Sequence, residues 1–276
     1  MKIIKKNTYE YILRKDNNNL IKFCPKRGGI ITNWVSNDSE ILYFDYKRFL
    51  DRTKSIRGGI PILFPICGSI ENNSLFGDDF LDLMQHGFAR DLEWNYEFNQ
   101  FNNTLLLILN DTEMTRKYYP YLFKIKIEIT LCNESLVFNI EIFNKSNTKM
   151  PLNFGLHPYF NISDFSNIRF IDYAKSCLNQ NNNNLVRTEN FLKNSSKGID
   201  LLMYSSGSTS FIDYGLKRKI TLINPPPFDL SVIWSDPPRQ MICMEPWTSP
   251  RNSLESGIRK IEIMPNSSKK LYASII

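Results

Sequence analysis

The two histidines of this 276-residue chain have neighbours that could position them for proton transfer. His86 stands in "LMQHGFARDLEW", directly before a glycine and four residues before Arg90. His157 stands in "NFGLHPYF", directly before a proline and two aromatic residues. Imidazole titrates nearest to neutral pH of all side chains, so both histidines are candidate proton donors or acceptors. A histidine packed in the core is the alternative in each case.

A candidate carboxylate partner, Glu245, follows an apolar run in "QMICMEPWTSPRNSL". We expect the strand to end at Met244 and burial to raise the pKa of Glu245, which would make it a useful proton acceptor. Pro246 holds Glu245 in an extended conformation, and Pro158 does the same for His157. Two such groups fixed by the backbone are typical of an acid and base in a preorganised site. A surface glutamate is the alternative.

Two arginines and a turn complete the candidate chemistry. Arg57 opens "RGGIPILFPICG", where the glycines and prolines predict a rigid turn that could bring backbone close to a ligand. A purely structural turn is equally open. Arg57 and Arg90 offer planar forks of donors suited to sugar hydroxyls or a phosphate, although surface arginines are common.

The charge of the chain argues against nucleic acid as a partner. The net charge of +6 is spread over short basic runs, "MKIIKK", "LKRK" and "SSKK", which are usually solvated surface. A nucleic-acid stripe would need longer runs interleaved with aromatic residues, and the sequence has none. A small anionic substrate would instead need one or two arginines inside a cleft.

The cysteines predict neither disulfides nor a metal site. They are widely separated, and no C-x-x-C pair or histidine stands at a zinc-ligand spacing. Their positions are Cys24, Cys67, Cys132, Cys177 and Cys243. No run approaches 18 apolar residues, and the N-terminus lacks an uninterrupted apolar h-region. We expect a reduced, soluble, cytoplasmic protein that does not associate with membranes and is, by default, a monomer.

Period-two alternation is the leading signal for secondary structure. In "YLFKIKIEITL" (121–131) apolar residues alternate with charged and polar ones, and "LVFNIEIF" (136–143) repeats the pattern after the turn "CNES". The pair predicts a β-hairpin with one solvated face. Further strands are expected at "TLLLILN", "KITLIN", "DLSVIW", "QMICM" and "IRKIEIM".

These elements predict an all-β fold. Many short strands without βαβ alternation favour a large antiparallel β-sandwich or barrel. The length would allow two domains of about 150 residues, but sandwiches of about 200–250 residues form single units. We expect one domain over residues 1–276. The segments "NQNNNN" (179–184) and "KNSSK" (193–197) are expected to be surface loops within it.

The order of the separated motifs resembles the aldose 1-epimerase (mutarotase) family, including its hexose-6-phosphate mutarotase-like branch. The motifs are "RGGIPILFP", "HGFAR", the hairpin, "FGLHPYF" and "EPWTSP", and the resemblance runs from about residue 20 to 272. It implies the galactose mutarotase-type fold, a large antiparallel β-sandwich in one domain. Both histidines then stand where that family keeps its site histidines.

The resemblance also implies roles for individual residues. Glu245 would be the general base on the C1 hydroxyl and His157 the general acid at the ring oxygen. His86 would hydrogen-bond the substrate near the same oxygen. Arg57 and Arg90 would bind the ring oxygen, hydroxyls or a phosphate.

Some positions stay open. The aspartate that binds sugar hydroxyls in the family is matched by Asp200 in "GIDLLMY", with Asp213 in "FIDYG" as a competitor. Ser69 stands where some relatives have arginine, so the arginine that polarises the sugar is undecided. The aromatic candidates for packing on sugar faces, with core packing as the alternative, are Phe88, Tyr159 and Trp247.

The expected activity is interconversion of the α and β anomers of a hexose or hexose 6-phosphate. One proton leaves the anomeric hydroxyl, another reaches the ring oxygen, and the opened ring closes on the other face, which needs no cofactor or metal. A carbohydrate-binding or sugar-sensing protein without turnover is the alternative, but binding alone needs no acid–base pair. A glycoside hydrolase or lyase would need a second placed carboxylate, and none is evident.

Overall fold

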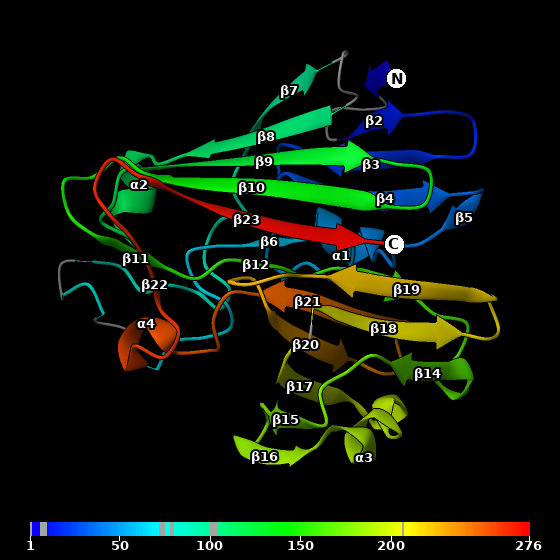
Figure 1. Ribbon diagram of the computed structural model, residues 1–276. Coiled ribbons are helices and arrows are strands. Elements are labelled where there is room, and N and C mark those ends of the chain that lie inside the picture. Colours follow the sequence, from blue (N-terminus) through cyan, green and yellow to red (C-terminus); the bar gives the residue numbers. More distant parts are fainter. Residues whose placement is uncertain (1, 6–9, 72–74, 78–79, 100–103, 206) are drawn as a thin grey trace.

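The chain folds into layered antiparallel β-sheets, as the computed structural model in Figure 1 shows. The structure describes residues 2–5, 10–71, 75–77, 80–99, 104–205 and 207–276. The predicted antiparallel β-sandwich is confirmed. Helices in these ranges are short: α1 (Tyr46–Leu50), α2 (Glu113–Arg116), α3 (Thr188–Leu192), α4 (Ser253–Ser256) and the 3-10 helices η1 (Phe165–Asn167) and η2 (Ser195–Lys197).

One large sheet contains the longest strands of the described chain. Its strand order is β14-β18-β19-β23-β10-β9-β8-β7. The bounds are β7 (Asn95–Asn99), β8 (Thr104–Asn110), β9 (Phe123–Leu131), β10 (Leu136–Asn144), β14 (Ile168–Ile171), β18 (Ser208–Asp213), β19 (Arg218–Ile223) and β23 (Ser268–Ile275).

The predicted hairpin is β9 and β10, and its alternation matches the burial. Ile125, Ile127 and Ile129 of β9 are buried, while Lys126 and Glu128 between them are partly exposed. The register places Ile140 opposite Ile127, so inward residues of the two strands meet on one face. A strand with period two can bury every second residue and leave the others in water, which is why this pattern predicted the hairpin.

The second large sheet carries the motifs singled out in the sequence. Its order is β16-β15-β17-β20-β21-β12-β6, and β13 also pairs with β21. The bounds are β6 (Ile62–Leu63), β12 (Gly155–Leu156), β13 (Tyr159–Asn161), β15 (Ser176–Asn179), β16 (Asn184–Arg187), β17 (Ile199–Tyr204), β20 (Leu230–Ser235) and β21 (Met241–Trp247). A small ribbon pairs β11 (Met150–Leu152) with β22 (Ile261–Ile263).

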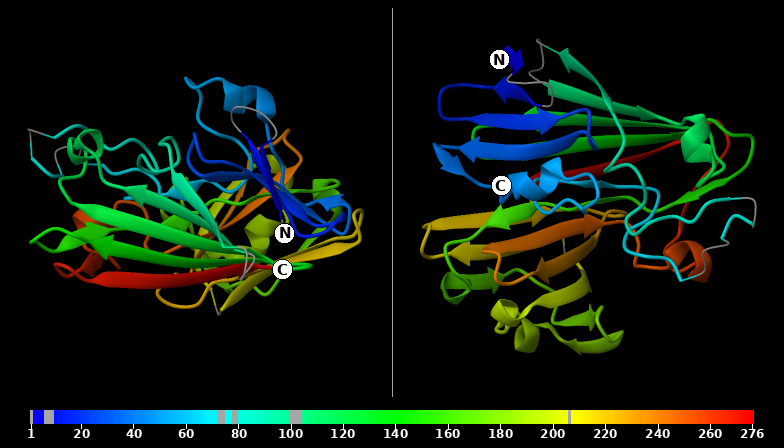
Figure 2. Two further views of the ribbon diagram at one scale, coloured as in Figure 1. Left: turned by 90° about the horizontal axis from the view of Figure 1, so that it is seen from above. Right: turned by 180° about the vertical axis from the view of Figure 1, so that it is seen from behind.

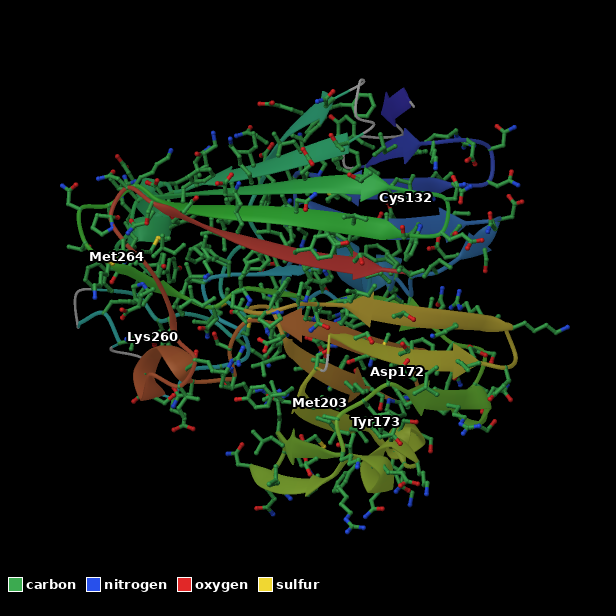
Figure 3. All side chains as sticks on the ribbon, viewed as in Figure 1. Cys132, Asp172, Tyr173, Met203, Lys260 and Met264 are labelled. Carbon is green, nitrogen blue, oxygen red and sulfur yellow. The ribbon has the colours of Figure 1, made fainter. Side chains whose placement is uncertain are left out.

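An N-terminal sheet lies against the long strands, as the two views in Figure 2 agree. Its strands are β1 (Lys2–Lys5), β2 (Tyr11–Arg14), β3 (Leu20–Cys24), β4 (Ile30–Ser36) and β5 (Ser39–Glu40). Trp34 of this sheet, Leu105 of β8 and Ile242 of β21 belong to one buried cluster, and side chains fill the space between the layers (Figure 3). That shared core supports the single domain over residues 1–276, which stays a prediction.

The two segments predicted to be surface loops, 179–184 and 193–197, are only partly exposed. In the first segment, residues 180–183 form the turn between β15 and β16, and Asn179 and Gln180 are buried. The second segment contains the 3-10 helix η2, with Ser195 buried. Both expectations fail where a polar side chain finds a partner inside the fold, because Gln180 hydrogen-bonds Asp200 and the Ser195 carbonyl accepts from Ser235.

The exposure of the basic runs and the state of the cysteines can be compared directly with the sequence expectations. The basic runs at 216–219 and 267–270 are largely exposed, whereas part of the run at 1–6 lies outside the described residues. All five cysteines are free thiols. No helix in the described part of the chain is long and apolar enough to cross a membrane.

Candidate active site

A cleft of about 200 Å³ opens on the face of β21 that is turned away from the main core. The size is below the range of about 300–1,000 Å³ typical of sites for drug-sized ligands, so it suits a smaller molecule. All six residues expected from the sequence line it. The lining residues are Arg57, Gln85, His86, Arg90, His157, Asp200, Val232, Trp234, Glu245, Trp247 and Arg251.

Alternation along β21 sorts its side chains between two environments. Ile242 and Met244 belong to the main core, while Cys243 and Trp247 belong to clusters on the other face. Glu245, between those two, therefore faces the cleft. The expectation that the strand ends at Met244 is wrong, because β21 continues through Trp247 with Pro246 paired opposite Ser231 of β20.

The register of the sheet brings His157 to Glu245. Gly155 pairs with Trp247 and Tyr159 with Cys243, so the position midway between them, His157, falls opposite Glu245. His157 lies where β12 stops and β13 has not begun. Directly opposite residues of antiparallel strands project to the same face, which explains how segments 88 residues apart in the chain (245 minus 157) form one pair.

The pair is close without being hydrogen-bonded. His157 Nδ1 lies 3.4 Å from Glu245 Oε1, beyond the 2.7–3.2 Å of an ordinary N–H···O bond. Nδ1 is buried and has no hydrogen-bond partner within the described residues. Trp247 Nε1 donates to Glu245 Oε2 at 3.0 Å. The His157 ring stacks on Tyr159 with centroids 4.5 Å apart and planes 5° from parallel, so both groups are held in orientation.

Burial shifts the pKa values of the pair in opposite directions. The pKa of Glu245 is raised well above its ordinary value of 4.5, first by burial and then by the charge of Asp200, while the Trp247 hydrogen bond opposes the rise. The pKa of His157 is lowered well below 6.5 by burial and by Arg90 and Arg57. Between these two pKa values the pair holds one proton, and the uncharged state, a carboxylic acid beside a neutral imidazole, is favoured.

His86 is fixed by a strained turn. Its φ is +67° and that of Gly87 is +69°. A Cβ on Gly87 would lie 2.2 Å from the carbonyl oxygen of Phe64, so glycine is required there. Gly68 N donates to His86 Nδ1 at 3.0 Å, and His86 N donates to the Gly68 carbonyl. Because Nδ1 accepts a hydrogen bond, the neutral ring carries its proton on Nε2 and can donate from there.

The pKa of His86 keeps it neutral as well. Burial lowers it well below 6.5, and His157 and Arg90 lower it further. The His86 and His157 rings lie 5.6 Å apart in an edge-to-face arrangement. The two imidazoles therefore face the same small volume, one as a fixed donor and one beside the carboxyl group.

Arg57 and Arg90 both lie at the cleft with weak ion pairs. Arg57 Nε is 3.7 Å from an Asp236 oxygen, and its guanidinium lies 5.3 Å from the centre of the Trp234 ring. Arg90 Nε is 3.7 Å from an Asp91 oxygen. Both distances exceed hydrogen-bonding range. Arg57 Nη1 donates to Ser55 Oγ and to the Ile56 carbonyl, and Arg90 Nη2 donates to the Gln85 carbonyl. Within the described residues, Arg57 Nη2 and Arg90 Nη1 are therefore the donors left for a ligand.

Asp200 lines the cleft and Asp213 does not. Gln180 Nε2 donates to Asp200 Oδ1 at 2.6 Å. The carboxylate of Asp213 instead accepts hydrogen bonds from Ser163 and from the backbone of Leu216, where it holds a turn. Chain position alone could not separate the two aspartates, since both stand on strands after an isoleucine.

Sequence reasoning missed four residues that line the cleft, Gln85, Val232, Trp234 and Arg251, and of these Arg251 forms an ion pair with Asp200. Nη2 of Arg251 donates to Asp200 Oδ2 at 2.5 Å, and the Arg251 stem crosses Gly68, where a Cβ would lie 2.2 Å from Arg251 Cγ. Gly68 precedes Ser69, the position where some relatives have arginine. Because Gly68 has no side chain, the stem of Arg251 can pass over it, and Arg251 brings a guanidinium group to the cleft. The signal available was its place four residues after Trp247 in the "EPWTSPR" segment.

The aromatic candidates have different positions. Phe88 packs on Phe64 and Phe123 in the main core, so the alternative of core packing holds for it. The Tyr159 ring stacks on the His157 ring and so helps to hold its orientation. Of the three, Trp247 lines the cleft.

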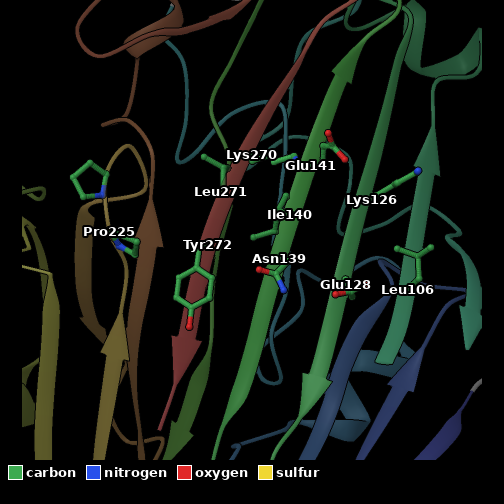
Figure 4. A pocket seen from close by; sticks show the side chains of 11 residues that line it. Leu106, Lys126, Glu128, Asn139, Ile140, Glu141, Pro225, Lys270, Leu271 and Tyr272 are labelled. Atoms are coloured by element: carbon green, nitrogen blue, oxygen red, sulfur yellow. The ribbon is translucent and has the colours of Figure 1, made fainter. Parts of the chain in front are cut away.

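A larger groove, about 600 Å³, runs over the solvated face of the other sheet (Figure 4). Opposite charges alternate there across neighbouring strands, with Lys126 opposite Glu141 and Glu141 opposite Lys270. Tyr272 lies beside them. Such pairs are the usual stabilising contacts of a wet sheet face. The groove has no imidazole and no buried carboxylate, so size alone does not make it the better candidate.

The cleft can therefore carry out general acid–base chemistry on a small polar molecule. A carboxyl and an imidazole face each other, a second imidazole offers an Nε2–H donor, and arginines surround them. Donor atoms of His157, Cys243 and Glu245 also lie within 4.8 Å of one another, a grouping that sequence spacing did not predict.

Comparisons with known proteins agree with this chemistry. A family model described as aldose 1-epimerase matches residues 10–272. The crystal structure of the Slr1438 protein from Synechocystis sp. PCC 6803 is 32% identical, covers 100% of this chain and 98% of its own, and superposes with a TM-score of 0.90. A galactose mutarotase related enzyme from Lactobacillus acidophilus shares the fold, with 21% identity, 96% coverage of each chain and a TM-score of 0.77.

A curated relative carries a more specific name. A protein of Cenchrus ciliaris, provisionally named a glucose-6-phosphate 1-epimerase, is 30% identical over 154 residues. That match covers 51% of this chain and 44% of the relative, so the chain spans less than half the length of this relative.

Proposed function

Because the chain belongs to the aldose 1-epimerase family, we propose that it interconverts the α and β anomers of a hexose, with hexose 6-phosphates as preferred substrates. The observation that carries the proposal is the facing of Glu245 Oε1 and His157 Nδ1 at 3.4 Å in a cleft that His86 and the arginines also line. An acid and a base on one small polar cavity are what ring opening of a cyclic sugar requires.

The proton shared by the pair supports chemistry in both directions. In the ionised form, Glu245 takes the proton of the C1 hydroxyl while His157 gives its proton to the ring oxygen. The C1–O5 bond breaks, and the C1–O1 bond becomes the carbonyl of the open-chain aldehyde. Rotation about C1–C2 turns the other face of the carbonyl to the C5 hydroxyl. Reclosure returns both protons, so no net proton is gained or lost.

The neighbouring groups would stabilise the charge that develops. His86 would donate from Nε2 to an oxygen of the substrate, since its Nδ1 is engaged by Gly68. Arg251 would supply the arginine contact to the sugar that Ser69 cannot make, and would orient Asp200 toward the hydroxyls. Preorganised donors of this kind are worth more in a water-poor cleft than in solution.

Positive charge supports a phosphorylated substrate. Arg57, Arg90 and Arg251 line the cleft, against the carboxylates of Asp200 and Glu245, and the raised pKa of Glu245 favours its uncharged form. Arg57 and Arg90 keep donors available, and planar guanidinium groups match phosphate oxygens in pairs. The Cenchrus ciliaris relative is named for a 6-phosphate substrate, which points the same way.

The proposal is tested by following anomer interconversion by polarimetry or NMR for glucose, galactose and glucose 6-phosphate. We expect catalysis of all three, with the highest kcat/KM for glucose 6-phosphate. No acceleration of any anomerisation over the uncatalysed rate would refute the activity. Equal kcat/KM for glucose and glucose 6-phosphate would refute the preference alone.

A further inference from the structure

We propose that the floor of the cleft is a binding site for a thiophilic divalent cation of the Zn²⁺ class, with His157, Glu245 and Cys243 as ligands. The inference about its effect rests on the proposed function: a cation bound there would occupy the lone pairs that transfer protons, and would inhibit the epimerase. No zinc-ligand spacing exists in the sequence, and the fold creates the group from two segments.

Sheet geometry places the three donors together. Cys243 and Glu245 are two residues apart on β21 and project to the same face, and His157 lies opposite Glu245. One donor atom from each residue lies within 4.8 Å of those of the other two. All three residues are buried, with exposed fractions of 8% for His157, 2% for Glu245 and 0% for Cys243.

The distances fit a tetrahedral ion. Bond lengths of about 2.0–2.3 Å to N, O and S ligands require roughly 3.3–3.6 Å between ligand atoms. The separation of His157 Nδ1 and Glu245 Oε1, 3.4 Å, is within that range. The Cys243 thiol lies within 4.8 Å of the other two donor atoms and contacts Met241 Sδ at 3.9 Å, so it has to move closer by about 1 Å to bind the same ion.

Two further features point to a ligand. His157 Nδ1 is a buried polar atom without a hydrogen-bond partner in the described part of the chain, and it faces Glu245. Trp247 already holds Glu245 Oε2, so Oε1 is the oxygen left for an ion, and the tryptophan orients the ligand as outer groups do at metal sites. The cleft reaches His157 and Glu245 from solvent, which leaves a fourth coordination position for water or a sugar oxygen.

The test uses Cd²⁺ as a spectroscopic probe and Zn²⁺ as the inhibitor. Cys132, just after β9 (Figure 3), is the partly exposed thiol, so all proteins carry Cys132→Ser to remove its signal. The ultraviolet charge-transfer band of a Cd²⁺–thiolate bond is titrated in this parent, in Cys243→Ser and in Cys243→Ala. Cys67→Ala is the matched control, because Cys67 is equally buried and lies near Glu245 but is outside the three-donor group.

We expect one equivalent of Cd²⁺ to develop the band in the parent and in Cys67→Ala, and no band in either Cys243 variant. Zn²⁺ should inhibit anomer interconversion in the parent, reversibly with a chelator, and removal of Cys243 should raise the inhibitory concentration at least about tenfold. Circular dichroism checks that each variant is folded. A folded parent without the band, or a band that survives in a folded Cys243 variant, would overturn the site. The absorbance does not depend on turnover, so failure of the epimerase activity is distinguishable from failure of the metal site.

Discussion

His157 lies opposite Glu245 across the β21 ladder, and the register of Gly155 with Trp247 and of Tyr159 with Cys243 fixes that placement. Glu245 lies on β21, and His157 lies in the short break between β12 and β13, which both pair with β21. The facing atoms of the two groups are 3.4 Å apart. Sites built on regular elements hold their geometry more tightly than sites on loops. The pair is therefore preorganised before any substrate arrives.

Removing either member of the pair should abolish most of the activity. Positioned proton transfer contributes typically about 10²–10⁴-fold, so Glu245→Gln and His157→Asn should each lower kcat by factors in that range with glucose 6-phosphate. The control is Glu97→Gln on β7, an exposed carboxylate on the other sheet, which should keep full kcat. If both pair variants keep the parent rate of anomer interconversion in the same polarimetric or NMR assay, the acid–base assignment is wrong.

The pH profile should reflect one shared proton. Only the singly protonated pair has both a donor and an acceptor, so kcat/KM should fall at both pH extremes. The lowered pKa of His157 moves the acid limb below 6.5, and the raised pKa of Glu245 moves the alkaline limb well above 4.5. Glucose is the substrate to use, because a phosphate titrates near pH 6. A profile with an acid limb at or above 6.5 would contradict the lowered imidazole pKa.

Local patterns predicted the strands well, because period two and burial are linked directly. The alternation in Phe123–Leu131 is reproduced residue by residue in the burial of β9. The end of the strand was misplaced at Met244, where the apolar run stops, because the pairing of Pro246 with Ser231 continues the strand past Glu245. Pairing between strands depends on the tertiary structure, so the sequence of one segment does not predict it.

Residues of the candidate site that stand in the recognised motifs were predicted from the sequence, and residues outside those motifs were missed. Glu245, His157 and His86 were named from their neighbours. Arg251 and Gln180 were not, because each acts through Asp200 from a distant part of the chain. Gln180 stands in an asparagine-rich stretch whose composition predicts a surface loop, and composition carries no information about a single buried contact.

The two aspartates should separate function from stability. Asp200→Asn weakens the contacts with Arg251 and Gln180 at the cleft, so kcat/KM per folded molecule should fall about tenfold or more. Asp213→Asn disrupts hydrogen bonds to a charged carboxylate, each worth about 1.5–3 kcal/mol. Its melting temperature should fall by several degrees, at about 2–4 °C per kcal/mol, with activity per folded molecule retained. The reverse pattern would assign the sugar-binding aspartate to Asp213.

The cleft arginines are expected to contact different parts of the substrate, Arg251 the sugar, and Arg57 and Arg90 the phosphate. Arg251→Met keeps the stem over Gly68 and removes the guanidinium, so kcat/KM should fall for glucose and glucose 6-phosphate by similar factors, about 10–150-fold for one charge-assisted hydrogen bond. Arg57→Met and Arg90→Met should instead affect glucose 6-phosphate more than glucose. Arg169→Met, an exposed arginine on β14, is the control. A loss in Arg251→Met confined to glucose 6-phosphate would make Arg251 a phosphate ligand instead.

The buried carboxyl should also make stability depend on pH in a defined direction. The pKa of Glu245 is raised in the folded protein by burial, so above about pH 4.5 the unfolded chain ionises this group while the folded chain retains its proton. The stability that the protonated group contributes is complete below that pH and is lost as the pH rises toward the folded pKa. Glu245→Gln cannot ionise and escapes this loss.

The melting temperature of Glu245→Gln relative to the parent should therefore increase from pH 5 to pH 9, at about 2–4 °C for each kcal/mol. Calorimetry or fluorescence melting at pH 5, 7 and 9 measures the difference, and Glu97→Gln should show no such trend because its carboxylate is exposed in both states. A constant difference between Glu245→Gln and the parent across this range would mean that Glu245 titrates as an ordinary carboxylate. The proton in the cleft would then reside on His157, and the uncharged pair would have to be replaced by an ion pair.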